Sequence, residues 1–307
     1  MLSRVIILLS VLHAFLHAAP LTQESIAQRY TQVINGVVAL TADDYVSTGK
    51  YEIDGDIEYK VYHLPVSHDF KPVYKDFNFY LNGSYSYGKV ESDEALFEGE
   101  VADEYTLKMD MYKLGAGVRY RPNEHFYIRA GYALIYSHVN SQYAYNSVFS
   151  KIILKPLLDN LVNDSQSNWT SEFALSFRYE KNIYGFLPYA FGEMKWYKTR
   201  TKLDLEKEYK LSSHAEIYRV QAGSFTPSLY RIEQKDIKLK GFVGRTYYGG
   251  DIQATGTSTY YNSYGAGVYL FSKSKSFFIE SVGLVSEWSQ GKNFNGYNIG
   301  LDIEFDF

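Results

Sequence analysis

Two groups of titratable side chains in the sequence could perform proton chemistry. The pair Asp43-Asp44 offers two carboxylates, and Ser67-His68-Asp69 brings a hydroxyl, an imidazole and a carboxylate together. An acidic pair with a histidine can support peptide hydrolysis only if the groups lie within hydrogen-bond reach of one another. The first group lies near the end of a predicted strand at 32–45, and the second lies at the far end of the next strand. If these strands cross a membrane, as argued below, about 30 Å of hydrocarbon separates the groups. We therefore expect no catalytic residues.

The remaining histidines and glycines predict no other reactive or metal-binding site. None of His63, His68, His125, His138 and His214 begins the motif His-x-Ser-Asn-Gly that one class of phospholipase requires. The chain has no cysteine, no histidine pair at ligand spacing and no glycine-rich phosphate loop. A formal net charge of -4 does not indicate the basic surface that nucleic-acid-binding proteins carry. We expect a protein that is not an enzyme and that needs no metal or cofactor.

The first nineteen residues predict an export signal. A short start with one positive charge, Met1–Arg4, precedes an apolar run of 12 residues, Val5–Leu16, and then small residues before Pro20. This order is typical of a secretory signal peptide, and the run is shorter than the roughly 20 residues of a membrane-spanning helix. We expect cleavage after Ala18 or Ala19, so that residues 1–19 are absent from the mature protein.

The composition favours an aromatic-rich β protein. The chain has 31 Tyr, 19 Phe and 3 Trp, together 17%, with 23 Gly, 7 Pro and no Cys. A small secreted domain often relies on disulfides, which this chain cannot form. A carbohydrate-binding sandwich with exposed tyrosines is one alternative, but it does not explain how the chain ends.

The C-terminal residues alternate strictly between apolar and polar. One face carries Tyr297, Ile299, Leu301, Ile303, Phe305 and Phe307, and the other carries Asn298, Gly300, Asp302, Glu304 and Asp306. A period of two predicts a strand with one apolar side. A final Phe preceded by alternating apolar residues resembles the signal that directs outer-membrane proteins to the barrel-assembly machinery.

The same alternation recurs upstream and predicts about 12 strands. We place them near 32–45, 51–69, 76–90, 105–121, 125–143, 168–181, 186–201, 212–226, 235–249, 257–272, 276–290 and 295–307. Short and long connections alternate, as in barrels with short periplasmic turns and longer outer loops. We expect an all-β, up-and-down transmembrane antiparallel β-barrel over 33–307 in the outer membrane of a Gram-negative bacterium. Near Met111-Tyr112 the alternation slips by one residue, which we interpret as a bulge or as strand above the membrane.

Three segments do not follow the strand pattern. Leu21–Gln32, within a short N-terminal segment at 20–32, predicts a helix with Thr22 as N-cap that could plug the lumen or lie in the periplasm. Phe149–Val162 predicts a helical hat in an outer loop. The acidic run at 91–104 could bind divalent cations or bridge lipopolysaccharide through them, although such runs are more often solvated loops.

Short motifs near both ends of the chain resemble solitary autotransporter-type barrels. They are Ile34-Asn-Gly-Val-Val-Ala-Leu40 at the predicted first strand, Tyr62-His-Leu-Pro-Val66, Tyr261-Asn-Ser-Tyr-Gly-Ala-Gly267 and Tyr297-Asn-Ile-Gly-Leu301. The resemblance implies a translocator-like barrel of about 12 strands and no catalytic residue. Only about a dozen residues separate the signal from the predicted first strand, so we expect no passenger domain.

The predicted inner wall carries charges of both signs and permits two functions. The predicted lumen residues are Arg119, Arg129, Arg178, Glu180, Arg219, Gln221, Lys238, Lys240, Asp302 and Glu304. One interpretation is a passive, closed barrel of unassigned role, in which opposite charges pair. The alternative is a porin-like channel for small hydrophilic solutes or ions, since 12 strands lie between a filled and an open lumen. As partners we expect outer-membrane lipids, lipopolysaccharide and the assembly machinery, and we expect a monomer.

Overall fold

The computed structural model describes residues 23–43, 48–53, 57–70, 74, 76–94, 101–204, 208–232, 235–255, 259–272, 279–292 and 294–305. The predicted signal peptide, Thr22, Asp44 and Phe307 lie outside the described residues. Among the described helices, none is both long and apolar enough to span a bilayer.

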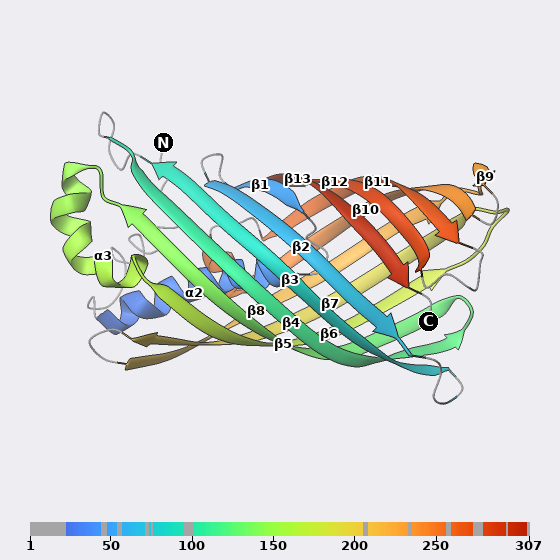
Figure 1. The fold of residues 1–307 in the computed structure, drawn as a ribbon, viewed down its shortest axis with the longest axis horizontal. Helices are drawn as coiled ribbons and strands as arrows, with labels where there is room; N and C mark the ends of the chain where they lie inside the picture. The colour runs from blue at the N-terminus through green and yellow to red at the C-terminus, as the bar shows by residue number, and fades with distance from the viewer. Residues whose placement is uncertain are drawn as a thin grey trace.

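Antiparallel strands make up most of the structure (Figure 1). The strands are β1 (Gly49–Ile53), β2 (Ile57–Asp69), β3 (Phe77–Glu94), β4 (Asp103–Asn123), β5 (Phe126–Ala144), β6 (Ser165–Glu180), β7 (Leu187–Asp204), β8 (Glu208–Phe225), β9 (Tyr230–Ile232), β10 (Lys235–Gly250), β11 (Tyr260–Ser272), β12 (Ile279–Gly291) and β13 (Phe294–Phe305). The helices are α2 (Gln23–Ala42) and α3 (Lys155–Val162), with a π-helical turn η1 (Ser150–Leu154) and a 3-10 turn η2 (Asp251–Thr255).

The strands close into a barrel. Of the 13 strands in the sheet, all except the three-residue β9 form a ring of 12, because β10 pairs with β11 and β13 pairs with β1. The closing pair is short, since β1 has 5 residues and its Gly49 faces both Asn298 and Val61. The predicted fold class and the strand number are confirmed.

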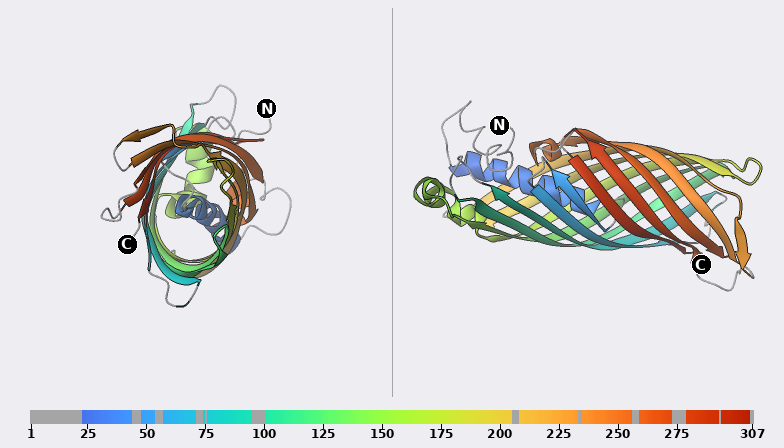
Figure 2. Two further views of the ribbon diagram at one scale, coloured as in Figure 1. Left: turned by 90° about the vertical axis from the view of Figure 1, so that its right-hand side faces the viewer. Right: turned by 90° about the horizontal axis from the view of Figure 1, so that it is seen from above.

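The first predicted strand is wrong, because Ile34–Leu40 belongs to a helix. The helix α2 continues ten residues past the predicted boundary at Gln32 and lies inside the ring (Figure 2). From Val33 to Ala42 all its residues are buried, including Ile34 and Val37. A helix enclosed by a barrel can be apolar on every face. The sequence of α2 therefore lacks the one-sided apolar pattern of a surface helix, and its β-branched residues favoured the prediction of a strand. The predicted strand at 51–69 is in fact the two strands β1 and β2, which restores the number to 12.

The barrel has an outer and an inner end. The longest connection, between β5 and β6, carries η1 and α3 at one end, and the C-terminus lies at the other (Figure 1). Long connections face the outside in this class of barrel, so the end with α3 is the outer end. The helical hat predicted for Phe149–Val162 is confirmed by η1 and α3.

An apolar band covers the outside of the barrel. Outward side chains such as Leu114, Leu134 and Phe173 are half-exposed or more. Aromatic pairs follow one level of this wall on the outer side of the band: Tyr85–Tyr112 with ring centroids 5.3 Å apart, Tyr136–Trp169 at 5.2 Å, Phe173–Trp196 at 5.6 Å, Trp196–Tyr218 at 6.1 Å and Tyr247–Tyr260 at 6.0 Å. We call these rings the outer girdle, the position at which Trp and Tyr meet the membrane boundary.

The strands extend beyond the girdle. The strand β4 has 21 residues, whereas about 10 suffice to cross a membrane. Above Tyr112, its outward positions carry the polar residues Glu104, Thr106, Lys108 and Asp110. The outer part of the barrel therefore stands in water.

The slip predicted near Met111-Tyr112 is not a bulge, whereas the other interpretation, strand above the membrane, agrees with the outer part of β4. The pairing of β4 with β3 runs without a shift from Asp103 to Tyr120, and inward and outward positions alternate throughout. The pattern blurs in the sequence because the inward residues Leu107, Met109 and Met111 are apolar. They face α2 rather than water. A shift in the pairing of β4 with β5 occurs instead between Tyr120 and Asn123.

Inward aromatic rings lie over glycines of neighbouring strands. A Cβ atom at Gly131 or Gly117 would collide with the ring of Tyr80, and one at Gly296 would collide with Tyr51. The missing side chains leave room for rings that lie flat against the wall. This packing explains why the chain combines many tyrosines with many glycines.

A charge placed on the lipid-facing wall should strongly oppose folding. Leu114 lies one outward position below the girdle residue Tyr112 and is 72% exposed. Leu114→Arg is expected to lower the free energy of unfolding of the barrel in vesicles by about 1–2 kcal/mol, because Leu114 lies between the interface and the midplane; denaturant titration measures this loss. The control Asn140→Arg, on the outward face of β5 above the girdle, should cost less than about 0.5 kcal/mol. Equal losses for the two variants would contradict the position assigned to the membrane.

Candidate functional site

The helix α2 fills the outer half of the lumen. Its residues Ala27, Val38 and Ala39 have no exposed surface. The wall around it is apolar and belongs to the same buried cluster: Val61, Val90, Leu107, Met109, Met111, Ile135, Val139, Ile217, Tyr248, Tyr261 and Phe294. The outer half of the barrel is therefore a packed core rather than a pore.

Hydrogen bonds fix α2 to three different parts of the wall. The Tyr30 hydroxyl lies 2.6 Å from Ser141 Oγ on β5, and Thr41 Oγ1 lies 2.7 Å from the Tyr59 hydroxyl on β2. Asn35 Nδ2 donates to Thr201 Oγ1 on β7 at 3.0 Å. These bonds define the rotation and the depth of the helix in the lumen.

A buried charge cluster holds the C-terminal end of α2. Asp43, which follows the helix directly, is fully buried and accepts hydrogen bonds from Lys195 Nζ at 2.8 Å and from the Arg219 guanidinium. Arg219 also donates to Glu193 Oε2 at 2.8 Å and to Thr246 Oγ1 at 3.3 Å. We call Asp43, Glu193, Lys195 and Arg219 the anchor cluster. It joins the plug to β7 and β8 by charge-assisted hydrogen bonds.

The anchor keeps Asp43 ionised. Burial alone would raise the pKa of Asp43, but the charges of Arg219 and Lys195 outweigh burial and hold this pKa well below its usual value. The carboxylate is therefore charged at neutral pH.

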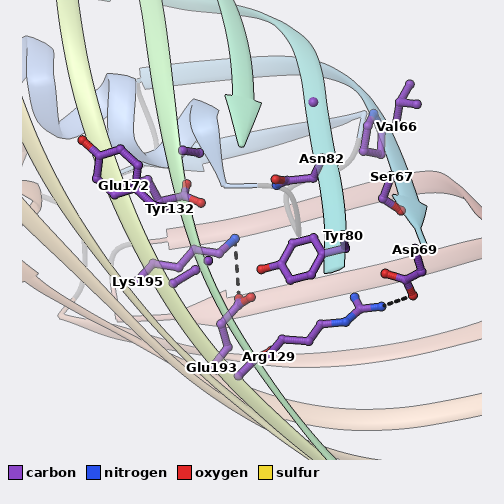
Figure 3. Close-up of a pocket in the computed structure, with 16 residues that line it drawn as sticks. Val66, Ser67, Asp69, Tyr80, Asn82, Arg129, Tyr132, Glu172, Glu193 and Lys195 are labelled. Carbon is purple, nitrogen blue, oxygen red and sulfur yellow. Dashed lines mark hydrogen bonds and ion pairs between the residues drawn. The ribbon is translucent and has the colours of Figure 1, made fainter. Parts of the chain in front are cut away.

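A second ion pair lies beside the anchor. Lys113 on β4 contacts Glu172 on β6 at 2.8 Å, and both side chains are almost fully buried. Glu172, Glu193 and Lys195 line a cavity of about 240 Å³ below α2, together with Tyr80, Asn82 and Arg129 (Figure 3). The cavity wall carries charges of both signs, which favours water or polar solutes and selects neither anions nor cations.

Cations and aromatic rings line the inner half of the lumen. Arg119 and Arg129 share the carboxylate of Asp69, with Arg129 Nη2 at 3.2 Å. On the opposite wall Lys240 lies between four rings, with centroids 5.2 to 5.7 Å away, and donates to the Tyr269 hydroxyl at 3.1 Å. The rings are those of Tyr189, Phe225, Phe242 and Tyr269. They narrow the lumen from one side.

Asp103 attaches the helical hat to the outer end of the barrel wall. Asp103 accepts hydrogen bonds from the Tyr143 hydroxyl at 3.0 Å, from the Ser147 backbone N–H at 2.8 Å and from Ser150 Oγ at 2.9 Å. Leu158 of α3 packs into the same core as α2. Asp103 is buried, so the solvated-loop expectation for the acidic run is wrong at this residue; Glu98 and Glu100 lie outside the described residues.

The structure places eight of the ten predicted lumen residues on inward positions. Arg119 and Arg129 meet at Asp69, Arg178 pairs with Glu180 at 2.9 Å, and Arg219 joins the anchor cluster. Gln221, Lys238 and Lys240 face the aromatic wall. Asp302 and Glu304 lie on β13, as do Leu301, Ile303 and Phe305. Tyr297 and Ile299 point outward and are about half-exposed.

The two groups considered for proton chemistry do not meet. Asp43 lies in the anchor cluster, Asp69 binds two arginines, and the His68 ring contacts Phe70 on the outside with centroids 4.6 Å apart. Among the described residues no group of three or more histidine, aspartate or glutamate side chains could hold a metal ion.

Sequence reasoning missed most of the anchor. Glu193 and Lys195 share the inward face of β7 with Tyr197, a signal that alternation alone could have supplied. Asp43 could not be found in this way, because it was assigned to a strand end at the rim.

Comparisons with known proteins agree with this architecture. Residues 38–304 match the family described as the solitary outer membrane autotransporter beta-barrel domain, whereas no curated protein sequence matches the chain. The β domain of the Bordetella autotransporter BrkA is 12% identical with a TM-score of 0.57, over 83% of this chain and 94% of that chain. The translocator domain of NalP from Neisseria meningitidis is 7% identical with a TM-score of 0.56, over 100% of both chains.

A third structure has the same fold. The transport unit of AIDA-I from Escherichia coli is 8% identical with a TM-score of 0.55, over 92% of this chain and 99% of that chain. At these identities the similarity shows the fold alone, while the family match covers most of the chain and confirms the resemblance noted in the sequence. The chain therefore belongs to the family of solitary outer membrane autotransporter β-barrel domains and is a bacterial outer-membrane protein.

Proposed function

We propose that this protein is a translocator-type barrel that is closed at rest, with α2 as its plug. We also propose that it is neither an enzyme nor a permanently open porin. The observation that carries the proposal is the anchor cluster, in which a fully buried Asp43 bridges the plug to two strands. A freely open channel would not need an apolar lumen wall at the level of α2.

The packing of α2 supports a closed resting state. The plug contributes side chains to the largest buried cluster described here and is bonded to β2, β5, β7 and β8. Moving it would expose apolar surface and separate buried charges, both of which are unfavourable. The porin-like alternative requires α2 to leave the lumen.

The expected partners follow from the barrel itself. The outward band and girdle fit outer-membrane lipids, including lipopolysaccharide on the outer side. The alternating residues of β13 fit recognition by the barrel-assembly machinery. We further propose that the protein acts as a monomer, because its described outward wall is a continuous lipid-facing band.

Planar-bilayer recording of the purified protein tests the plug. The intact protein is expected to show no conductance steps, and a variant that lacks residues 20–42 is expected to show them, because 12 strands enclose more space than a filled barrel of about 8. Heat modifiability on a mild gel verifies that the shortened barrel is folded. Steady conductance by the intact protein would contradict the proposal. A folded, shortened barrel that shows no conductance steps would also contradict it.

A further inference from the structure

A column of cations rises from the outer girdle on β7. Starting at the girdle residue Trp196, the next outward positions are Lys198, Arg200 and Lys202, and all three side chains are exposed. The pairing places Trp169 beside Arg200 on one side and Ser212 on the other. Lys198 lies between Ser171 and His214.

No carboxylate pairs with Lys198 or Arg200 in the described part of the chain. Two acids near the column, Glu216 on β8 and Asp251 in η2, are engaged elsewhere. Glu216 accepts a hydrogen bond from the Tyr218 hydroxyl at 2.8 Å, and Asp251 lies 4.0 Å from His214 and binds its backbone N–H at 2.7 Å. Two adjacent cations thus remain available to an external anion.

The wall of β1–β3 above the girdle provides a contrast. There Glu58 contacts both Lys50 and Lys60, and Glu91 contacts Lys89 at 2.6 Å and Lys60 at 3.5 Å. These cations are neutralised by their own strands. The absence of a carboxylate partner for Lys198 and Arg200 among the described residues is therefore not a general property of the outer wall.

Lys198 stands at the height of the head-group layer, and Arg200 stands just above it. Two residues along a tilted barrel strand rise about 5 Å, so Lys198 and Arg200 stand about 5 and 10 Å above Trp196. The polar layer of a leaflet extends roughly 5–8 Å beyond the hydrocarbon. Trp169 and Trp196 mark the hydrocarbon boundary beside the column.

We propose that Lys198 and Arg200 form a binding site for the phosphate groups of a phosphorylated glycolipid in the outer leaflet. A guanidinium binds phosphate through two parallel hydrogen bonds, and an ammonium adds a second positive charge. The flanking tryptophan rings lie where the lipid's sugars and first acyl carbons meet the protein. The site deepens the proposed association with lipopolysaccharide and does not depend on the plug.

Native mass spectrometry of the full-length barrel in zwitterionic detergent tests this site. The probe is lipid A with two phosphates, compared with the same glycolipid after enzymatic removal of both phosphates. Each cation near an anionic lipid changes affinity about fivefold, so Lys198→Gln/Arg200→Gln should bind lipid A about 25-fold more weakly than wild type. The dephosphorylated glycolipid should bind wild type at least tenfold more weakly than lipid A.

A matched variant controls for net charge. Lys50→Gln/Lys89→Gln removes two cations from the same side of the membrane, but both are already paired, so its affinity should stay within about twofold of wild type. Equal weakening by both double variants, unchanged binding by Lys198→Gln/Arg200→Gln, or equal binding of the dephosphorylated lipid would overturn the proposal.

Two further outcomes separate the alternatives. Competition by millimolar inorganic phosphate would assign the site to a free anion and overturn the lipid assignment, whereas unaffected binding supports it. Conductance of the same preparations reports on α2 alone. A failure of the lipid site and a failure of the plug are therefore distinguishable.

Discussion

Asp43→Ala is expected to lower the free energy of unfolding by about 5 kcal/mol, the upper end of the range for breaking a buried ion pair. The loss is large because one substitution leaves both Lys195 and Arg219 buried with one carboxylate, Glu193, between them. Denaturant titration of the barrel in vesicles measures it. The same variant should show intermittent conductance in planar bilayers, because α2 loses its C-terminal anchor. A loss below about 1 kcal/mol would show that the anchor does not hold the plug.

Asp43→Asn and a pH titration serve as controls. The amide keeps the shape and one acceptor oxygen, so its loss should be smaller than that of alanine. The folded pKa of Asp43 is depressed, so its contribution is fully present above the unfolded pKa of about 3.9. The contribution is lost only as the pH falls through the depressed folded value. Wild type should therefore remain closed at pH 5, and opening between pH 7 and pH 5 would contradict the assigned role of Asp43.

Glu172→Leu is expected to cost about 4 kcal/mol, because it leaves the ammonium of Lys113 buried without its carboxylate. The double variant Lys113→Met/Glu172→Leu should recover most of the loss and lie within about 1 kcal/mol of wild type. Apolar side chains of similar volume often replace a buried pair without penalty.

The comparison of single and double variants isolates the pair. Denaturant titration of all three proteins in the same vesicles provides the numbers. A double variant as unstable as Glu172→Leu alone would mean that Glu172 stabilises the wall through other neighbours.

The barrel could be predicted because its two faces differ chemically. Phe77, Phe79 and Leu81 face lipid while Asn78 and Asn82 face the lumen, so a period of two appears directly in the sequence. Where the inward residues are polar or small, as along the inner half of β5 and β6, the predicted strands were confirmed.

The helix α2 could not be predicted as a plug because, at its level, the inner and outer faces of the wall are both apolar. Opposite α2 the inward residues Met109 and Met111 are as apolar as the outward ones, so β4 seemed to slip. From Val33 onward the helix itself is buried on every side, and the one-sided apolar stripe of a surface helix is missing. Ile34–Leu40 therefore resembled a buried strand.

The sequence predicted that inward charges form ion pairs, but it did not predict which residues pair with each other. Alternation placed Arg219 on the inner face, and the closed-barrel interpretation expected inward charges to pair. Its partner Asp43 lies 176 residues away, a distance over which local patterns carry no information. Lys198 and Arg200 were equally visible in the sequence, but their availability depends on where Glu216 and Asp251 are engaged among the described residues.

The brevity of β1 makes the ring's junction its weakest mechanical point. Only five residues join β1 to β13, while β4 and β5 are paired along nearly their whole length. The junction also links segments about 250 residues apart, so the chain entropy lost on closing it exceeds that of every hairpin. We expect the hairpins to form first and this junction to form last, once the C-terminal strand has reached the membrane. Under pulling force or denaturant the barrel should unroll from the same place.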